Sequence, residues 1–224
     1  MPPDAPHDTK TRLLDAAESL LASQGIGNTS LRQITEKAGV NLALVKYHFE
    51  SKDGLVAATL QRRLEPINAI RIHLLEELEA RHPNGPLPLD DILTALIRPV
   101  VDLGLGGGPL GRQFLKLFGR IFSEPAAAMN VMRQQMGPMI QRFDAAFARS
   151  LPHLTDSDMG WRKMATLGVV QHSLLMLSMM DELPLHLRLP IKFLRGTPKP
   201  DLVLRQLVAF CSAGMQATLP SHSE

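Results

Sequence analysis

The strongest constraint on the fold is the spacing of apolar residues, which recur every three to four positions in almost every long segment of this 224-residue chain. No segment alternates apolar and polar residues convincingly, as a half-buried β-strand would. The segments expected to be helical are 9–24, 31–37, 41–49, 52–78, 89–103, 110–123, 126–151, 157–183 and 201–218. Three of these nine are short and lie close together near the start. The sequence therefore predicts an all-α protein.

Glycines and prolines set the expected boundaries. Gly25 and Gly39 are expected to end the first two helices, because glycine accepts the left-handed backbone found at helix ends. Pro66 is expected to bend or break the fourth helix, and Pro99 and Pro138 are expected to kink two later ones. Stretches rich in glycine, proline or both are expected to form connections at 82–88, 104–109 and 184–200.

Several classes of protein are disfavoured by the composition. The single cysteine, Cys211, cannot form an internal disulfide or a cysteine-cluster zinc site. The motifs G-x-S-x-G, H-E-x-x-H and the P-loop do not occur. Gly106, Gly108 and Gly111 match G-x-G-x-x-G, but they follow no expected strand and Pro109 interrupts them. We therefore expect no catalytic activity, no metal and no cofactor.

Charge and hydropathy constrain partners and location. The formal net charge is +2, and residues 1–54 hold six Lys and Arg against seven Asp and Glu, which leaves −1. Any DNA contact must therefore come from the placement of a few cations. The longest apolar stretch, 164–180, is interrupted by Gln171, His172 and Ser173, so we expect a buried helix and no membrane span. The N-terminus lacks the pattern of a secretory signal, and we expect a cytoplasmic protein.

Residues 31–49, LRQITEKAGVNLALVKYHF, have the spacing of a helix-turn-helix. Gly39 provides the tight turn between the two helices. The residues expected to pack inward are Ile34, Ala38, Val40, Leu44 and Val45. The residues then left outward on the second helix of the pair are Asn41, Leu42, Ala43, Lys46 and Tyr47. This outward face is the one that would enter a major groove, although a helical hairpin of another kind also fits the pattern.

Residues 29–55, TSLRQITEKAGVNLALVKYHFESKDGL, resemble the DNA-binding region of TetR-family repressors. The matching elements are Thr29-Ser30, Ala38-Gly39-Val40, Tyr47-His48-Phe49, Ser51-Lys52 and Leu55. Thr35 and Lys46 depart from the usual pattern: Thr35 is expected to pack, and Lys46 to alter base preference. The resemblance implies a three-helix DNA-binding domain, placed at 9–54, and a larger ligand-binding and dimerisation domain, placed at 55–218. Disordered tails are expected at 1–8 and 219–224.

The resemblance also implies a homodimer that binds operator double-stranded DNA. The candidate DNA-binding residues are Thr29, Ser30, Arg32, Asn41, Leu42, Ala43, Lys46, Tyr47, His48 and Lys52. Family positions that touch phosphate correspond to Thr29, Tyr47, His48 and Lys52. Chemistry suggests phosphate or guanine for Arg32 and Lys46, adenine for Asn41, and thymine methyl groups for Leu42 and Ala43. The alternative is that these residues are ordinary solvated surface, and that His48 packs behind Tyr47.

Aromatic and methionine side chains form stripes on two successive helices and suggest a cavity for a large apolar ligand. The candidate ligand-binding residues are Arg112, Phe114, Phe118, Arg120, Phe122, Met132, Met136, Met139, Phe143 and His172. The arginines are candidates to hold a carboxylate. Residues 114–124 and 210–217 are also similar to segments of a fatty-acid-responsive subfamily, which implies a long-chain fatty acid or its thioester. Plain core packing is the alternative for any single residue.

The last two long helices are expected to form the dimer interface. The candidate interface residues are His172, Leu175, Met179, Leu204, Leu207, Val208, Cys211 and Met215. The resulting hypothesis is a repressor that leaves a palindromic operator when a small apolar effector binds, although the sequence also allows an effector that promotes binding. Two alternatives remain: an architectural DNA-binding protein without an effector and, least favoured, a helical enzyme.

Overall fold

The computed structural model describes residues 6–121, 126–179 and 198–218, with side chains except at 6–8, 120–121, 126–132, 134 and 135. Those ranges contain nine α-helices and no strand. The helices are α1 Pro6–Gln24, α2 Leu31–Ala38, α3 Leu42–Phe49, α4 Lys52–Arg81, α5 Leu89–Gly106, α6 Gly108–Ile121, α7 Ala126–Ser150, α8 Asp156–Met179 and α9 Pro200–Gln216. The all-α prediction is confirmed.

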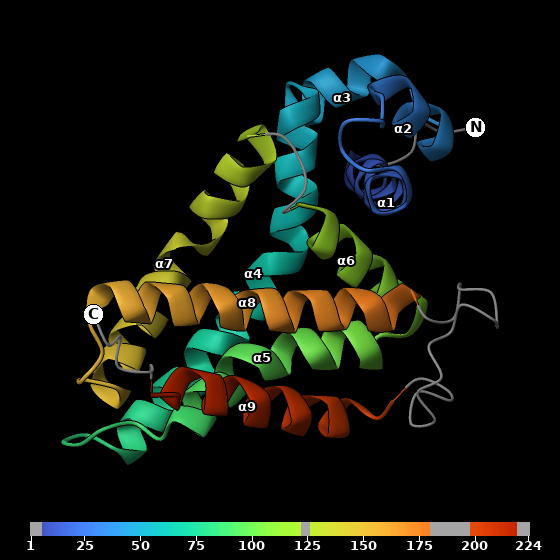
Figure 1. Ribbon diagram of the computed structural model, residues 1–224. Coiled ribbons are helices and arrows are strands. Elements are labelled where there is room, and N and C mark those ends of the chain that lie inside the picture. Colours follow the sequence, from blue (N-terminus) through green and yellow to red (C-terminus); the bar gives the residue numbers. More distant parts are fainter. Residues whose placement is uncertain (1–5, 122–125, 180–197, 219–224) are drawn as a thin grey trace, which may run out of the picture.

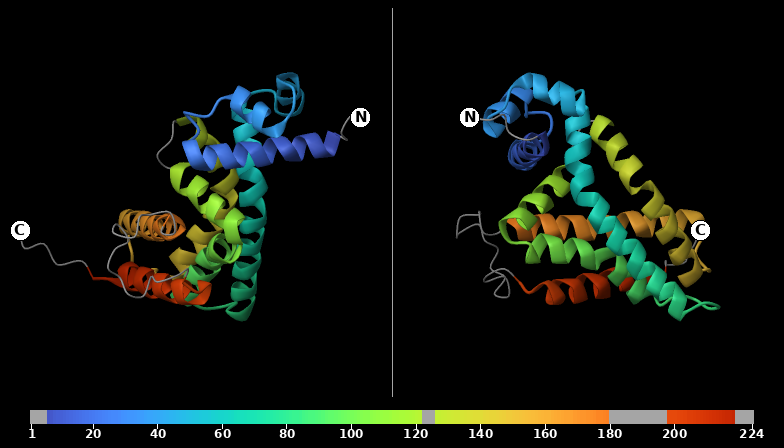
Figure 2. Two further views of the ribbon diagram at one scale, coloured as in Figure 1. Left: turned by 90° about the vertical axis from the view of Figure 1, so that its right-hand side faces the viewer. Right: turned by 180° about the vertical axis from the view of Figure 1, so that it is seen from behind.

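The helices form two parts, joined by the continuous α4 and by the packing of α1 on α6. Helices α1 to α3 gather at one end of the molecule, and the long α4 runs from them into a larger body made of α5 to α9 (Figure 1). Helix α5 lies inside this body and contacts α4, α6, α7, α8 and α9. Helices α8 and α9 run antiparallel beside each other on one side, and α4 lies on the opposite side (Figure 2). Helix α4 is therefore a direct mechanical connection between the two parts.

Side-chain caps begin the helices of the DNA-binding end. Ser30 forms a capping box with Gln33 at the start of α2, and the Asn41 side chain accepts a hydrogen bond at the start of α3. Ser51 caps α4 in the same way. Helix α1 begins at Pro6 instead of Thr9, so residues 6–8, which we assigned to the tail, belong to this helix.

The expected break at Pro66 does not occur, because α4 continues without interruption to Arg81. Pro66 lies on the exposed side of the helix, where water can hydrogen-bond the carbonyl that the proline leaves without a helical donor. Contacts of α4 with α1, α5 and α7 on both sides of Pro66 hold the helix in one piece. Pro99 and Pro138 also lie inside uninterrupted helices.

The predicted connection 104–109 is wrong in length, because α5 continues to Gly106 and α6 begins at Gly108. Gly108 has a φ of 60° and turns the chain back. A Cβ on Gly111 would lie 2.1 Å from the carbonyl oxygen of Leu103, and one on Gly104 would lie 2.5 Å from Leu115. Gly108 and Gly111 of the motif-like segment, together with Gly104, therefore allow α5 and α6 to cross at close range.

Candidate DNA-reading surface and effector-binding core

The helix-turn-helix packs on its predicted inward side. Ile34 and Val45 are fully buried, Ala38 is buried, and Val40 and Leu44 are half-buried against the same core. Thr35 also packs, with its hydroxyl donating to the carbonyl of Arg32. These contacts hold α3 in a defined orientation on α1 and α2.

Arg12 of α1 holds the turn between α2 and α3, and the sequence analysis missed this role. Its Nε donates to the carbonyl oxygen of Ala38 at 3.0 Å, and its Nη2 donates to that of Gly39 at 2.9 Å. Gly39 has a φ of 64°, in the left-handed region. A guanidinium at the C-terminal end of α2 also complements the helix dipole. No local pattern identifies this contact, because the partners lie 26 and 27 residues apart.

The outward face of α3 is exposed as predicted. Tyr47 is 79% exposed and Leu42 is 52% exposed, and Ala43 and Lys46 are exposed beside them. The ring of Tyr47 meets that of His48 edge-on, with centroids 4.9 Å apart, so the half-buried His48 supports the tyrosine. This surface lies at the far end of the molecule from α9 (Figure 1). It combines a cation, a phenol and apolar groups suited to a groove wall and base edges.

Two residues predicted to contact phosphate instead donate hydrogen bonds to backbone carbonyls of the chain itself. Thr29 is 1% exposed and donates its hydroxyl to the carbonyl of Gly25 at 2.7 Å, so its side chain is not available to DNA. Lys52 is half-buried and donates its Nζ to the carbonyl of Ile26 at 2.7 Å. Both side chains stabilise the loop between α1 and α2, which the sequence motif could not distinguish from a DNA contact.

Three other candidates lie at the surface with local partners. Ser30 is a helix cap, and the side-chain oxygen of Asn41 accepts from the amide of Ala43 at 2.9 Å. Arg32 is exposed and pairs with Glu36 at 2.9 Å. An exposed i,i+4 pair of this kind is weak, so Arg32 can exchange Glu36 for a phosphate.

A buried ion cluster joins the DNA-binding end to α4. Glu18 of α1 is 1% exposed, and both Arg62 and Arg63 of α4 bind its carboxylate. The Nε of Arg63 lies 2.9 and 3.0 Å from the two oxygens of Glu18, and Arg62 also binds Asp15 at 2.6 Å. Burial opposes the charge of Arg62, but the carboxylates of Asp15 and Glu18 outweigh it and raise its pKa. We call these four residues the Glu18 clamp.

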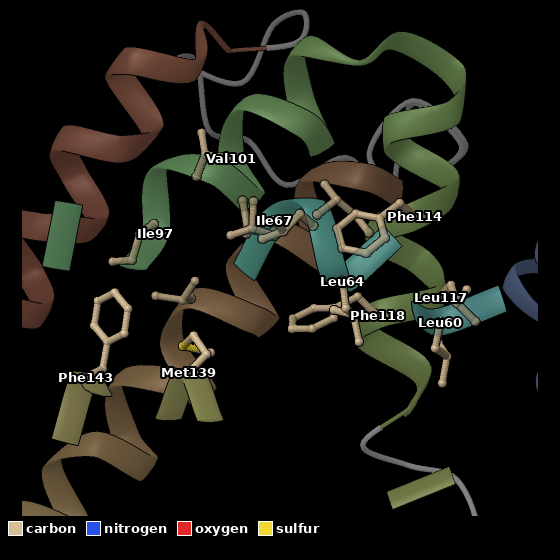
Figure 3. Close-up of a cluster of buried hydrophobic side chains, with 14 of the residues drawn as sticks. Leu60, Leu64, Ile67, Ile97, Val101, Phe114, Leu117, Phe118, Met139 and Phe143 are labelled. Atoms are coloured by element: carbon tan, nitrogen blue, oxygen red, sulfur yellow. The ribbon is translucent and has the colours of Figure 1, made fainter. Parts of the chain in front are cut away.

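The predicted effector residues that the structure describes converge only in part. Phe114 and Phe118 of α6 and Met139 and Phe143 of α7 are buried in one apolar cluster, with leucine and isoleucine side chains of α4 and α5 (Figure 3). Met136 is half-buried one turn from Met139. Phe122 and the side chains of Arg120 and Met132 lie outside the described residues.

Two further effector candidates, Arg112 and His172, are less buried than the cluster of α6 and α7. Arg112 is half-buried near the start of α6. His172 is exposed on α8, so its assignment to the effector site is wrong: its side chain faces away from the core.

Arg71 of α4 is a candidate that the sequence analysis missed. It is almost fully buried, its Nε donates to the carbonyl of Leu96 at 2.8 Å, and its Nη1 donates to Asn68 at 3.2 Å. Burial lowers the pKa of Arg71 to about 10, and no Asp or Glu in the described ranges forms an ion pair with it. Asn68 also contacts the sulfur of Met136 at 3.5 Å. A buried cation therefore lies next to the methionine stripe of α7.

The predicted interface on α9 is wrong, because its apolar stripe is the core of the subunit itself. The buried residues are Leu204, Leu207, Val208, Cys211 and Met215. Helix α9 packs on α5 and α8. Burial also raises the pKa of the Cys211 thiol.

The predicted interface on α8 lies in a different environment. Leu175 is half-buried and packs over Gly119 of α6, and Met179 is half-buried. His172 remains exposed and is the predicted interface residue that most clearly faces outward.

Exposed stripes, apolar except for His172 and Gln206, lie on the opposite sides of the same two helices. On α8 the stripe consists of Trp161, Met164, Ala165, Gly168, His172 and Met176. On α9 it consists of Leu202, Gln206, Ala209, Phe210 and Ala213. Phe210 is 66% exposed, which is unusual for a side chain of that size unless a partner covers it. We call these two stripes together the α8/α9 face.

Neither a metal site nor a membrane span is found in the described ranges. Among the residues described there, no group of three or more His, Cys, Asp or Glu is placed to hold a metal ion. None of the described helices is long and apolar enough to cross a membrane.

The supported helix-turn-helix and the separate helical body define a DNA-binding transcriptional regulator. The chain belongs to the TetR family. Residues 94–214, more than half of the chain, match the family described as the tetracyclin repressor-like C-terminal domain. Residues 13–59 match the bacterial regulatory proteins of the tetR family.

Individual relatives are similar to this chain at low identity. The HTH-type transcriptional regulator BetI of Paraburkholderia phymatum is 23% identical over 147 residues, which cover 64% of this chain and 69% of that protein. The structure of a putative transcriptional regulator from Pseudomonas aeruginosa has a TM-score of 0.61 at 19% identity and covers 94% of this chain and 89% of the other. The regulator FadR of Bacillus subtilis, in complex with stearoyl-CoA, has a TM-score of 0.62 at 11% identity and covers 91% and 98%. At these identities the structures establish the shared fold.

Proposed function

We propose that this regulator is a cytoplasmic repressor that binds a palindromic operator as a homodimer and leaves it when an amphipathic, mainly apolar effector binds. The observation that carries the proposal is the exposed face of α3, held in place by the buried side of the helix-turn-helix and by Arg12. Leu42, Ala43, Lys46 and Tyr47 would contact the major groove and its phosphates. Thr29 and Lys52 would support this surface from behind.

Selection from a pool of random duplexes tests the DNA-binding part. A dimer with two recognition helices about one helical turn, 34–36 Å, apart enriches inverted repeats with that half-site spacing. A protein that coats DNA without an effector enriches no common sequence. Enrichment of a single, unrepeated site would contradict the proposed dimeric reading.

The α8/α9 face supports the proposed homodimer. Its apolar residues are uncovered in one subunit, and Gly168 leaves open space where a partner helix can approach closely. A two-fold axis through this face would bring together two helices from each subunit. Such an interface leaves α3 of both subunits free to meet DNA.

The buried cluster of α6 and α7 and the adjacent Arg71 support an acidic apolar effector. Phe114, Phe118, Met139 and Phe143 supply adaptable apolar surface, and Arg71 supplies a charge that lacks an acidic partner in the described ranges. The FadR structure with stearoyl-CoA demonstrates that a protein of this fold can hold a long acyl chain. We therefore propose a long-chain fatty acid or its thioester, bound by Arg71 instead of Arg112 or Arg120.

Titrating saturated fatty acids of increasing length against the complex with the enriched palindrome tests the effector. Each buried methylene contributes about 0.8 kcal/mol, so the concentration for half-release should fall about fourfold per methylene until the site is full. Linkage requires that the palindrome weaken binding of the acid by the same factor by which the acid weakens binding of the palindrome. A flat response to chain length, or release by a small polar metabolite instead, would contradict the proposal and leave the cluster as core.

A further inference from the structure

A pocket of about 420 Å³ lies between α4 and α5, outside the buried cluster. Helix α4 crosses α5 on the side of the body away from α8 (Figure 2, right). The walls of the pocket include Pro66, Ile70 and Leu74 of α4 and Pro99 and Leu103 of α5. Ile70 is 51% exposed, so part of the apolar wall is uncovered. The volume is within the range of small-molecule sites.

Three arginines and one acid complete the pocket: Arg62, Arg63 and Arg98, with Asp102. The Nε of Arg63 binds Glu18, but its two Nη groups make no hydrogen bond to the described part of the chain. The Nε of Arg62 is buried and also lacks a partner there. Arg98 binds Asp201 at 3.2 Å and lies 3.9 Å from Asp102, both through its Nη1. The two Nη groups of Arg63, a residue of the pocket lining, are therefore left as donors for an anion.

Charge and shape restrict what the pocket can hold. The lining contains three guanidinium groups and one carboxylate, which favours an anion over a cation, and the apolar walls from Pro66 to Leu103 disfavour a fully polar ligand. Asp102 would repel a compact dianion more strongly than a monoanion. A carboxylate with a short apolar group satisfies both requirements, because the Nη edge of Arg63 matches a carboxylate and the walls cover the rest.

Two of these arginines, Arg62 and Arg63, also belong to the Glu18 clamp, which holds α1 against α4. An anion on the Nη groups of Arg63 would share the positive charge of that guanidinium with the buried carboxylate of Glu18 and so weaken their pair. We propose that the α4/α5 pocket binds a small amphipathic monocarboxylate, and that binding loosens the Glu18 clamp, shifts α1 with its helix-turn-helix, and weakens operator binding. The effect on the operator rests on the proposed function; the binding site does not.

Calorimetry with the intact protein tests the site, with 4-phenylbutanoate as the probe and neutral 4-phenylbutan-1-ol as its match. The acid should bind at least tenfold more tightly than the alcohol. Ile70→Glu should weaken acid binding at least tenfold more than Ile70→Gln does, because the new carboxylate repels that of the probe. The glutamine variant has nearly the same shape without the charge. Ile70 is 51% exposed, so both variants should fold, and circular dichroism of both is the control. Equal binding to Ile70→Glu and Ile70→Gln would overturn the site.

Operator binding tests the coupling, with the palindrome enriched in the selection above. The probe should weaken operator binding by the wild type and leave it unchanged in Glu18→Gln, while calorimetry still detects the probe. Asp15→Asn is the matched control: Asp15 is exposed and binds Arg62 alone, so this variant should keep the response. Probe binding without any change in operator affinity would overturn the coupling. If wild-type protein enriches no sequence, the proposed function fails, but calorimetry still decides the site.

Discussion

At the residue scale, two buried charged side chains among the described residues are in opposite situations. Glu18 is held by two arginines, whereas Arg71 donates to a carbonyl and an amide without an acid in the described ranges. Burial lowers the pKa of Arg71 to about 10, so the folded state holds this proton less tightly than the unfolded state does. The burial penalty is therefore fully present below about pH 10 and is relieved only as the pH rises above that value.

Arg71→Met should stabilise the protein and remove its response to fatty acids. Replacing a buried charge by an apolar side chain of similar length is expected to raise the free energy of unfolding by about 1–4 kcal/mol. Urea unfolding at neutral pH measures the change, and Arg142→Met, which removes a half-exposed pair with Glu79, should change it by less than about 0.5 kcal/mol. A strongly destabilised Arg71→Met would show that the bonds to Leu96 and Asn68 are structural.

Lys46→Ala and Lys52→Ala should separate DNA contact from structural support. Lys46 is exposed on α3, so its loss should reduce the salt dependence of operator binding by about one unit of slope. Lys52 donates to Ile26, so its loss should lower stability by about 1 kcal/mol and leave the slope unchanged. Binding at several salt concentrations, together with urea unfolding, distinguishes the two. A reduced slope for Lys52→Ala would return this residue to the DNA contacts.

At the scale of elements, close approach at glycines decides how α5 and α6 join. Gly104 leaves room for Leu115, and Gly111 lies against the backbone of α5. A loop would separate the two helices, whereas this junction brings Phe114 and Phe118 over α4 (Figure 3). The position of the buried cluster therefore depends on Gly104, Gly108 and Gly111.

Gly111→Ala should destabilise the protein by at least about 3 kcal/mol, because the new Cβ would overlap the carbonyl oxygen of Leu103 unless the helices separate. Gly106→Ala is the matched control, since its Cβ meets nothing within 4 Å and alanine favours a helix. Thermal unfolding of the two variants measures the difference. Equal stability would mean that the crossing of α5 and α6 is less close than the structure indicates.

At the scale of the whole molecule, the proposed function requires two subunits. Helices α8 and α9 lie on one side of the body, whereas α4, which lines the α4/α5 pocket, lies on the other (Figure 2). A dimer through the α8/α9 face leaves the pocket open to solvent. In the proposed coupling, a ligand in the α4/α5 pocket would act on α4 without disturbing the dimer face.

Phe210→Glu should convert the dimer to monomers, because each two-fold interface would bury two carboxylates without partners. Leu110→Glu is the control: Leu110 is similarly exposed, but it lies at the start of α6, outside the α8/α9 face. Light scattering should report a monomer for the first variant and a dimer for the second. A dimeric Phe210→Glu protein with normal operator binding would place the interface elsewhere.

The sequence by itself determined the helical class, the positions of the helices and the outward face of α3. These features depend on local spacing, caps and turns: Ser30, Gly39 and Asn41 act on backbone groups no more than a few residues away. The periodicity of α9 was also recognised correctly, and its stripe from Leu204 to Met215 is apolar as predicted.

Only the tertiary structure decided which element covers the apolar face of each helix and which charged side chains form contacts. An apolar period indicates that a helix face is buried, but it does not tell whether α5 of the same chain or a second subunit buries it. The contacts of Arg12 with Ala38, of Arg62 with Glu18 and of Arg71 with Leu96 join residues 25 to 44 positions apart. Such pairs depend on how whole helices pack, and no local pattern encodes them.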